Sequence, residues 1–163
     1  MKILHYSFLP NGLIRVDYPG NQILWIQRNE HSGRVVRRTK INTLSKVQHT
    51  GIYLGVDYYT REPLILHNHY RVGFPYISTY QDYALGQQVY WHEGRCTNNP
   101  SMVLSIALRD AKAGISYDVL LNNCQTYTNR ACHNRNHSED VTKWVGGLLG
   151  ISLVIGFVRA IAS

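Results

Sequence analysis

The chain has 163 residues, of which 44% are hydrophobic and 17% charged, so it has enough apolar material for one domain with its own core. Its three cysteines form no CxxC pair, which argues against a zinc or redox site of that type and predicts free thiols without disulfide bridges. The amino terminus lacks the apolar run and small-residue cleavage site of a secretory signal, so synthesis in the cytoplasm is expected.

The first half of the chain alternates short β-branched and aromatic runs with turn residues. This pattern predicts an antiparallel sheet of about five strands. The predicted strands cover residues 12–18, 22–27, 51–56, 63–67 and 87–91.

Residues 28–40, RNEHSGRVVRRTK, concentrate the positive charge of a chain whose formal net charge is +7. The only acidic residue of this segment is Glu30. Its basic residues are Arg28, Arg34, Arg37, Arg38 and Lys40. The pattern predicts a solvated basic hairpin or loop whose charges protect a sheet edge. Attraction to an anionic membrane surface is the second interpretation. Nucleic-acid binding is the least favoured, because no recognition motif accompanies the charge.

Two helices are predicted in the second half of the chain. Asn99 and Pro100 form an N-cap followed by a first-turn proline, and Gly114 ends the helix that they begin. A second helix is predicted to start near Cys124, with Asn122 or Asn123 as its N-cap. Strands followed by helices predict an α+β domain in which an antiparallel sheet packs on helices.

The end of the chain is an apolar segment, residues 141–163, which we separate from a domain of residues 1–140. Between Val145 and Val158 the only polar side chain is Ser152. As a helix, residues 144–162 would extend roughly 28 Å, which is about the thickness of the hydrocarbon core of a bilayer. An apolar C-terminal helix, transmembrane or interfacial, is therefore predicted, with a core helix as the alternative.

Cys124 has the setting that a nucleophilic cysteine needs. Only the thiolate attacks, and the unsatisfied amides and dipole at a helix start stabilise negative charge. The same amides can supply an oxyanion hole. By comparison, Cys132 would lie about two turns into this helix and Cys96 in a polar loop, so both are predicted to be structural or incidental.

A base for this thiol is expected among the eight histidines of the chain. His49 begins the strand run HTGIYLG, in which His49, Gly51 and Tyr53 share one face and the small Gly51 leaves room beside the ring. The next run, PLILHNH, is expected to pair with this strand as a hairpin, which places His67 or His69 near His49. Either residue could orient the base.

These motifs resemble the lecithin retinol acyltransferase-like family of thiol enzymes. In that family a strand motif H-[WY]-[AG]-IY-[LV]-G carries the base histidine, which matches His49 in HTGIYLG. A motif NCEHFV, preceded by G-x-x-Y and a short apolar run, carries the cysteine, which matches Cys124 in GISYDVLLNNCQTYTN. The family's second histidine closes an apolar run such as YVVH, which matches LILH and favours His67 over His69.

The resemblance implies a circularly permuted papain-like fold of the NlpC type, in which two histidines precede the cysteine. It implies catalytic roles for His49, His67 and Cys124: the thiol attacks an ester carbonyl, an acyl-thioester forms, and water or an amine takes the acyl group. The family's donor is typically a glycerophospholipid. We therefore expect a phospholipid acyl hydrolase or acyltransferase without a cofactor, held at the cytoplasmic face of a membrane by its basic segment and C-terminal tail. Gln125 and Thr126 depart from the family motif and leave the substrate open.

Other functions remain alternatives at this point. A thiol peptidase or amidase of the same superfamily would use the same residues. A non-enzymatic membrane-interacting module would explain the changed residues after the cysteine. A zinc site is a further alternative, because His133 and His137 are four residues apart beside Cys132. Solvated histidines at a helix end are the favoured interpretation there, so neither a metal nor a nucleic-acid partner is expected.

Overall fold

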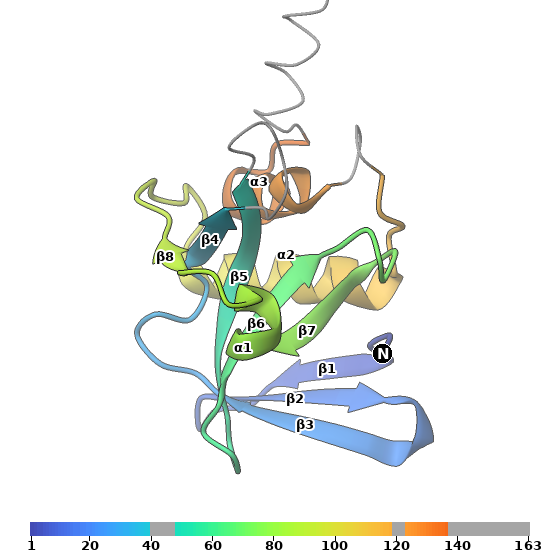
Figure 1. Cartoon of the computed structure of the whole chain (residues 1–163). Helices are drawn as coiled ribbons and strands as arrows, with labels where there is room; N and C mark the ends of the chain where they lie inside the picture. The colour runs from blue at the N-terminus through green and yellow to red at the C-terminus, as the bar shows by residue number, and fades with distance from the viewer. Residues whose placement is uncertain (40–47, 119–122, 137–163) are drawn as a thin grey trace, which may run out of the picture.

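The computed structural model describes residues 1–39, 48–118 and 123–136, and within them the chain forms one eight-stranded sheet, three α-helices and a 3-10 turn, Pro19–Asn21. The strands are β1 (His5–Phe8), β2 (Leu13–Tyr18), β3 (Gln22–Gln27), β4 (Val35–Thr39), β5 (Gln48–Asp57), β6 (Pro63–Asn68), β7 (Pro75–Thr79) and β8 (Tyr90–Trp91). The helices are α1 (Tyr80–Ala84), α2 (Pro100–Ala113) and α3 (Cys124–His133). Figure 1 shows their arrangement.

The strand pairs of the sheet are antiparallel, and β5 is its centre. The first part of β5 pairs with β4 and its end pairs with β3, while β6 pairs with its middle and end. The β5–β6 hairpin is the one expected from the sequence. The prediction of an α+β fold with an antiparallel sheet is confirmed, although the sheet has more strands than expected.

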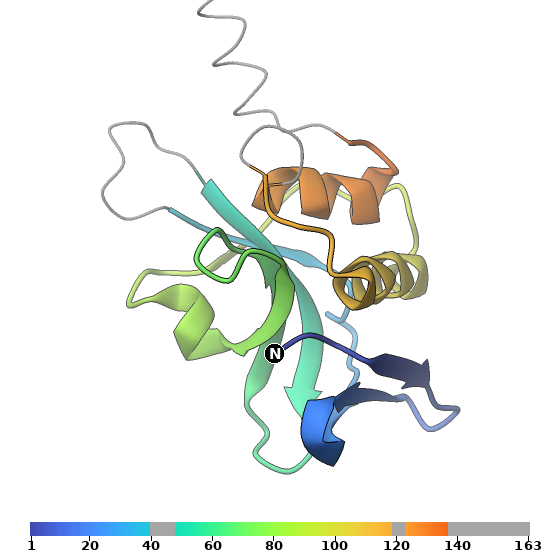
Figure 2. The same cartoon turned by 90° about the vertical axis from the view of Figure 1, so that its right-hand side faces the viewer.

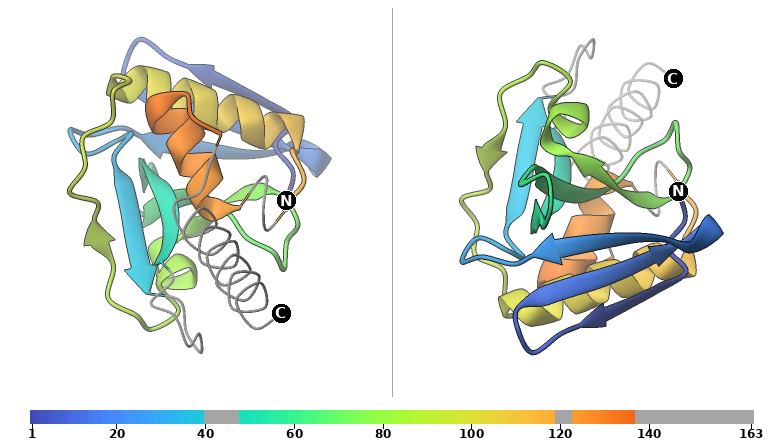
Figure 3. Two further views of the ribbon diagram at one scale, coloured as in Figure 1. Left: turned by 90° about the horizontal axis from the view of Figure 1, so that it is seen from above. Right: turned by 90° about the horizontal axis from the view of Figure 1, so that it is seen from below.

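Helices cover both faces of the central strands. Helices α2 and α3 pack against each other on one side, and α1 lies on the other side (Figure 2). The β1–β3 ribbon runs along α2, as Figure 3 shows. Alternation along β5 directs Ile52 and Leu54 into the main core with α2 and α3, whereas Tyr53 packs with Tyr83 of α1 in a second, smaller cluster.

The two predicted helix starts are confirmed. The Asn99 side chain accepts a hydrogen bond from the Met102 amide at the start of α2, and Gly114 ends that helix with φ at +63°, a left-handed conformation that favours glycine. The Asn123 side chain caps α3, which begins at Cys124. Local capping chemistry therefore sets where the candidate nucleophile lies.

Strand β4 differs most from the expectation. The basic segment, residues 28–40, was expected to be a solvated hairpin or loop. Residues 28–34 do form a loop, whereas residues 35–39 form a strand between β5 and β8, so the expectation of a solvated segment is wrong for this strand. Arg38 is only 4% exposed. The Val-Val-Arg-Arg run places one valine and one arginine on each face of the sheet, so neighbouring arginines have different surroundings.

The expectation that the thiols are all free is also wrong. Cys96 and Cys132 form a disulfide with a Cα–Cα distance of 4.6 Å, which ties the segment before α2 to the last turn of α3. The two residues are 36 positions apart, and spacing alone does not reveal such a pair. Cys124 remains as a buried free thiol.

The structure corrects the prediction of a transmembrane helix. In the described part of the chain, no helix has the length and apolar character needed to cross a membrane. The segment 141–163, on which that prediction was based, lies outside the described residues, as do the expected boundary at residue 140 and His137.

Candidate active site

The central feature of the site is a pair of buried imidazoles. His49 lies near the start of β5 and His67 near the end of β6, and each is 1% exposed. His49 Nε2 lies 2.9 Å from His67 Nδ1, and the two rings are nearly perpendicular. The β5–β6 hairpin thus brings together the predicted base and the predicted orienting residue.

A serine continues this pair. His67 Nε2 lies 3.0 Å from Ser78 Oγ on β7, and Ser78 is buried. His49, His67 and Ser78 therefore form a buried imidazole chain across three strands. Sequence reasoning did not find Ser78, because its position depends on the register in which β6 pairs with β7, where His67 faces Tyr76.

When both rings are neutral, the imidazole chain allows two proton arrangements. Burial lowers the pKa of His67 to about 3, and the charges of His69 and Arg38 act in the same direction, so His67 is neutral near pH 7. A neutral His67 that donates from Nε2 to Ser78 Oγ accepts at Nδ1 from the Nε2–H of His49. In this tautomer Nδ1 is the basic nitrogen of His49.

Gly51 leaves room for three neighbouring side chains. A Cβ atom at this position would lie 3.2 Å from the Cβ of His67 and 2.6 Å from Cγ2 of Ile65. It would also lie 3.1 Å from a ring carbon of Tyr83. The three atoms nearest to such a Cβ belong to Ile65, Tyr83 and His67, so the space expected beside the His49 ring stays a prediction.

His69 lies close by but in a different setting. Its ring centroid is 5.4 Å from that of His49 and 4.8 Å from that of Tyr70, on which it stacks. Its Nδ1 accepts a hydrogen bond from the Arg71 amide at 3.2 Å. Because His67, and not His69, shares the 2.9 Å contact with His49, the geometry favours His67 as the orienting residue.

Cys124 is the first residue of α3 and is 2% exposed. Its Sγ lies 3.9 Å from the carbonyl oxygen of Gln48, the residue that precedes His49. A 3.0 Å hydrogen bond between the hydroxyls of Thr50 and Thr128 holds α3 against β5. The packing of α3 on β5 therefore brings the thiol to the end of the strand that carries the predicted base.

The amides at the start of α3 are mostly occupied. The Asn123 side-chain oxygen accepts from the amides of Gln125 and Thr126, at 2.9 and 3.0 Å. The Tyr127 amide donates to the backbone oxygen of Asn123 at 2.9 Å. The Tyr127 bond is the first one within the helix; among the amides of the first three helical residues, that of Cys124 has no partner in the described part of the chain and is the candidate oxyanion donor.

Arg38 and Tyr83 complete the site, and sequence reasoning missed both. Arg38 faces His49 across the β4–β5 pairing, and its Nε donates to the backbone oxygen of Tyr83. The Tyr83 hydroxyl donates to the backbone oxygen of His49 at 2.8 Å and lies 3.2 Å from that of Val36. Tyr83 thus links α1 to both strands beside the imidazole chain.

The electrostatics place the thiol within this group. Burial raises the pKa of Tyr83 well above its usual value, and negative charge on Cys124 adds to the effect. Burial likewise raises the pKa of Tyr117 to about 12, again with a contribution from Cys124. Burial lowers the pKa of Arg38, and charge on Tyr83, Cys124 and Tyr76 partly opposes that shift. A negative charge on Cys124 would therefore act on Arg38 and on both tyrosines.

The zinc alternative loses one of its ligands. Cys132 is bonded to Cys96, and His133 Nδ1 lies 3.3 Å from the Thr97 hydroxyl. His137 lies outside the described residues. In the ranges that the structure covers, no three histidine, cysteine or acidic side chains are grouped as metal ligands.

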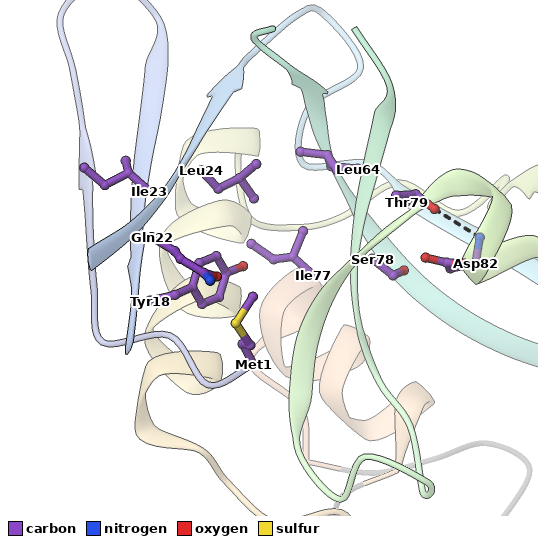
Figure 4. A pocket seen from close by; sticks show the side chains of 10 residues that line it. All are labelled: Met1, Tyr18, Gln22, Ile23, Leu24, Leu64, Ile77, Ser78, Thr79 and Asp82. Atoms are coloured by element: carbon purple, nitrogen blue, oxygen red, sulfur yellow. Dashed lines mark hydrogen bonds between the residues drawn. The ribbon is translucent and has the colours of Figure 1, made fainter. Parts of the chain in front are cut away.

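A cavity of about 310 Å³ opens near the far end of the imidazole chain (Figure 4). Ser78 lines it and also contacts His67. The other lining residues are Met1, Tyr18, Gln22, Ile23, Leu24, Leu64, Ile77, Thr79 and Asp82. Cys124 and His49 are not among them, so this cavity is separate from the thiol.

Comparisons with known proteins return no match: no family model, no curated protein and no solved structure matches the chain. What the structure establishes is an α+β domain with an antiparallel sheet that holds a buried histidine pair and a free thiol at a helix start. The resemblance to the lecithin retinol acyltransferase-like family stays a prediction.

Proposed function

We propose that this protein is a thiol enzyme that forms an acyl-cysteine intermediate on Cys124, with His49 as its base and His67 as the residue that orients the base. The observation that carries the proposal is the buried His49–His67 contact of 2.9 Å near the start of β5, where the Cys124 sulfur also packs against the Gln48 carbonyl. A nucleophile, a base and a group that orients the base are the three parts that such catalysis needs.

The first half of the reaction uses the basic Nδ1 of His49. This atom takes the thiol proton as Cys124 Sγ bonds to the carbonyl carbon of an ester. The imidazolium that forms donates from Nε2 to the neutral His67, which stabilises it. When the tetrahedral intermediate collapses, the ester C–O bond breaks, the alcohol leaves with the proton from His49, and the thioester remains.

The second half returns the enzyme to its starting state. His49 takes a proton from water or from an amine as that acceptor bonds to the thioester carbon. Collapse breaks the C–S bond and returns this proton to the sulfur. The products are a carboxylic acid with water or an amide with an amine, and the electrons and protons balance without a redox partner.

The finer fold assignment forms part of the same proposal. We propose a circularly permuted papain-like arrangement of the NlpC type, as in the lecithin retinol acyltransferase-like family. The chain order of His49, His67 and Cys124 and the position of the thiol at a helix start support it. The family's typical donor makes a glycerophospholipid the proposed acyl donor, and the excess of 17 basic over 10 acidic residues is compatible with anionic headgroups.

The test is acyl turnover on phosphatidylcholine vesicles, with and without an added primary amine. Wild type should release fatty acid or form the amide, and Cys124→Ala should abolish both. His5→Gln, an exchange of an exposed histidine on β1, is the matched control and should keep wild-type activity. Mass spectrometry of the wild-type protein during turnover should find an acyl adduct on Cys124.

Three outcomes would contradict the proposal. Lipid turnover that survives Cys124→Ala would remove the thiol from the mechanism. Cleavage of peptides without lipid turnover would move the protein to the peptidase alternative. A chain without turnover or adduct on either substrate class would favour the non-enzymatic module.

A further inference from the structure

Ser78 lies between the histidine pair and a cavity. Its hydroxyl is 3.0 Å from His67 Nε2, and the residue is 7% exposed. In the β6–β7 pairing Ser78 is opposite Ile65, two residues before His67, so the serine and the histidine project from the same face of the sheet. In the described part of the chain, His67 is the one hydrogen-bond partner of this hydroxyl. Ser78 also borders the cavity of about 310 Å³ shown in Figure 4.

The His67 ring is held in place by its neighbours. Its centroid lies 4.5 Å from that of Tyr76 and 5.1 Å from that of Tyr83. Among the described residues, its Nδ1 contacts His49 and its Nε2 contacts Ser78. A neutral imidazole carries one ring proton, so His67 donates to one of these two partners and accepts from the other.

The direction of these two hydrogen bonds decides whether His49 can act as a base. If His67 donates to Ser78, it accepts from the Nε2–H of His49, and Nδ1 of His49 keeps a free lone pair. If Ser78 donates to His67, the Nδ1–H of His67 donates to His49 Nε2, and the proton of a neutral His49 lies on Nδ1. Neither nitrogen of His49 can then take a proton from Cys124. The mechanism proposed above therefore requires the first direction.

The cavity favours this first direction. A serine hydroxyl has a single proton to donate. The cavity has polar side chains in its wall, those of Gln22, Thr79 and Asp82 beside Ser78, and it is large enough for several water molecules. Ser78 can donate its proton to water there, which leaves an oxygen lone pair for the Nε2–H of His67. A serine closed off from solvent would have His67 as its only acceptor, and this would favour the opposite direction.

We propose that Ser78 is a positioning residue of this site: its hydroxyl accepts the Nε2 proton of His67 and so keeps Nδ1 of His49 free to act as the base. The inference rests on the proposed function of His49. Ser78 touches no reacting atom and gives up no proton in the reaction, because it acts through His67. When His49 becomes an imidazolium, the hydrogen bonds from His49 to His67 and from His67 to Ser78 point in one direction and strengthen each other.

The test compares Ser78→Thr with Ser78→Val, two side chains of nearly the same shape of which only threonine has a hydroxyl. Because Ser78 borders a cavity, the added atoms have room. The control is Ser101→Ala, which removes the hydroxyl of an exposed serine on α2. Alanine is less suitable at position 78, since water from the cavity can replace the missing hydroxyl.

Nitrogen NMR spectra of isotope-labelled histidine rings show which ring nitrogen carries the proton. Near neutral pH, wild type, Ser78→Thr and Ser101→Ala should have His67 and His49 protonated at Nε2. In Ser78→Val the Nε2–H of His67 would have no acceptor, and a buried donor is rarely left unpaired, so both rings should change to the Nδ1–H form. The variants His67→Gln and His49→Gln assign the signals.

Reaction rates measure the consequence for the base. In Ser78→Val the kcat of acyl turnover should fall about tenfold, the order that one hydrogen bond contributes. KM should stay within about twofold, because the cavity beside Ser78 is separate from the thiol. Alkylation of Cys124 by iodoacetamide needs no substrate and should slow in the same variant. Cys124 is the only cysteine outside the disulfide, so alkylation of the unreduced protein reports on this thiol alone. Ser78→Thr and Ser101→Ala should match wild type in all three measurements.

A wild-type His67 that is protonated at Nδ1 would overturn the inference, and this measurement requires no variant to fold. Equal rates in Ser78→Thr and Ser78→Val would also overturn it, while the thiol mechanism would stand. Failure of the proposed function looks different. A wild type without acyl turnover, in which the ring protons and the Cys124 alkylation rate still depend on a hydroxyl at position 78, would leave the positioning role of Ser78 standing.

Discussion

The two faces of β5 differ in composition and in what they do. Toward α2 and α3 the strand presents Ile52 and Leu54 to an apolar core, together with a threonine pair that fastens α3. Toward α1 it presents His49 and Gly51 to a polar group of histidines, an arginine and a tyrosine. One strand thus joins a face that stabilises the fold to a face that carries the proposed base and the residue that orients it. Substitutions one residue apart should therefore change different properties.

The largest effect is expected from His49→Gln on the polar face. Removing a general base costs about 10²–10⁴-fold in rate, so acyl transfer should fall by that factor. The free energy of unfolding should change much less, because glutamine keeps a polar side chain next to His67. The checks are initial rates on vesicles and a urea titration. If His49→Gln unfolds enough of the protein to explain the lower rate of acyl transfer, the contrast between the two faces would be wrong.

The next effect is on stability, from Ile52→Ala on the apolar face. Ile52 is completely buried in the main core, and such truncations cost about 2–5 kcal/mol. Urea denaturation should show this loss, and the remaining folded protein should keep its Cys124 alkylation rate. Ile23→Ala, which truncates an exposed isoleucine on β3, is the control and should change stability by less than about 0.5 kcal/mol.

The pH dependence of stability should depend on His67. Its pKa is lowered to about 3 in the folded state against an ordinary value near 6.5, so the unfolded chain binds the extra proton first. Protonation of His67 in the unfolded chain does not reduce the free energy of unfolding above about pH 6.5. As the pH falls from there toward 3, the free energy of unfolding decreases by at most about 1.4 kcal/mol per pH unit. Urea midpoints at pH 7.5, 6 and 4.5 should show this loss.

His67→Gln should flatten that pH dependence, whereas His5→Gln, at an exposed position on β1, should keep the wild-type slope. Equal slopes in wild type and His67→Gln would mean that the protonation of His67 does not limit stability in acid. The comparison of the two variants separates the buried imidazole from the other histidines of the chain.

The smallest effect is expected from Gly51→Ala. The added methyl would meet Ile65, Tyr83 and His67 at 2.6, 3.1 and 3.2 Å, and such overpacking costs about 1–3 kcal/mol. Because it pushes on the imidazole pair, the variant should also slow Cys124 alkylation. Thermal melting together with alkylation rates checks this. A variant with the wild-type melting temperature and the wild-type alkylation rate would show that the site accommodates the added methyl group without strain.

The sequence predicted the parts of this molecule that depend on neighbours along the chain. Asn99 with Pro100, and Asn123 before Cys124, mark the helix starts because capping acts within one turn. Alternation in HTGIYLG and LILH predicted the hairpin that holds both histidines. The short strands β1 and β7, the helix α1 and the residue Ser78 escaped prediction, because they form through pairing and packing with distant segments.

By itself, then, the sequence determined the capped helices, the hairpin and the identity of the candidate thiol and imidazoles, since each depends on contacts within a few residues. Tertiary structure decided the rest. The register of β5 with β4 places Arg38 opposite His49, whereas Arg37 belongs to the other face, and no property of two adjacent arginines foretells this. The packing of α3 on the sheet decides where the Cys124 sulfur lies and joins Cys132 to Cys96, because only the folded chain brings such distant residues together.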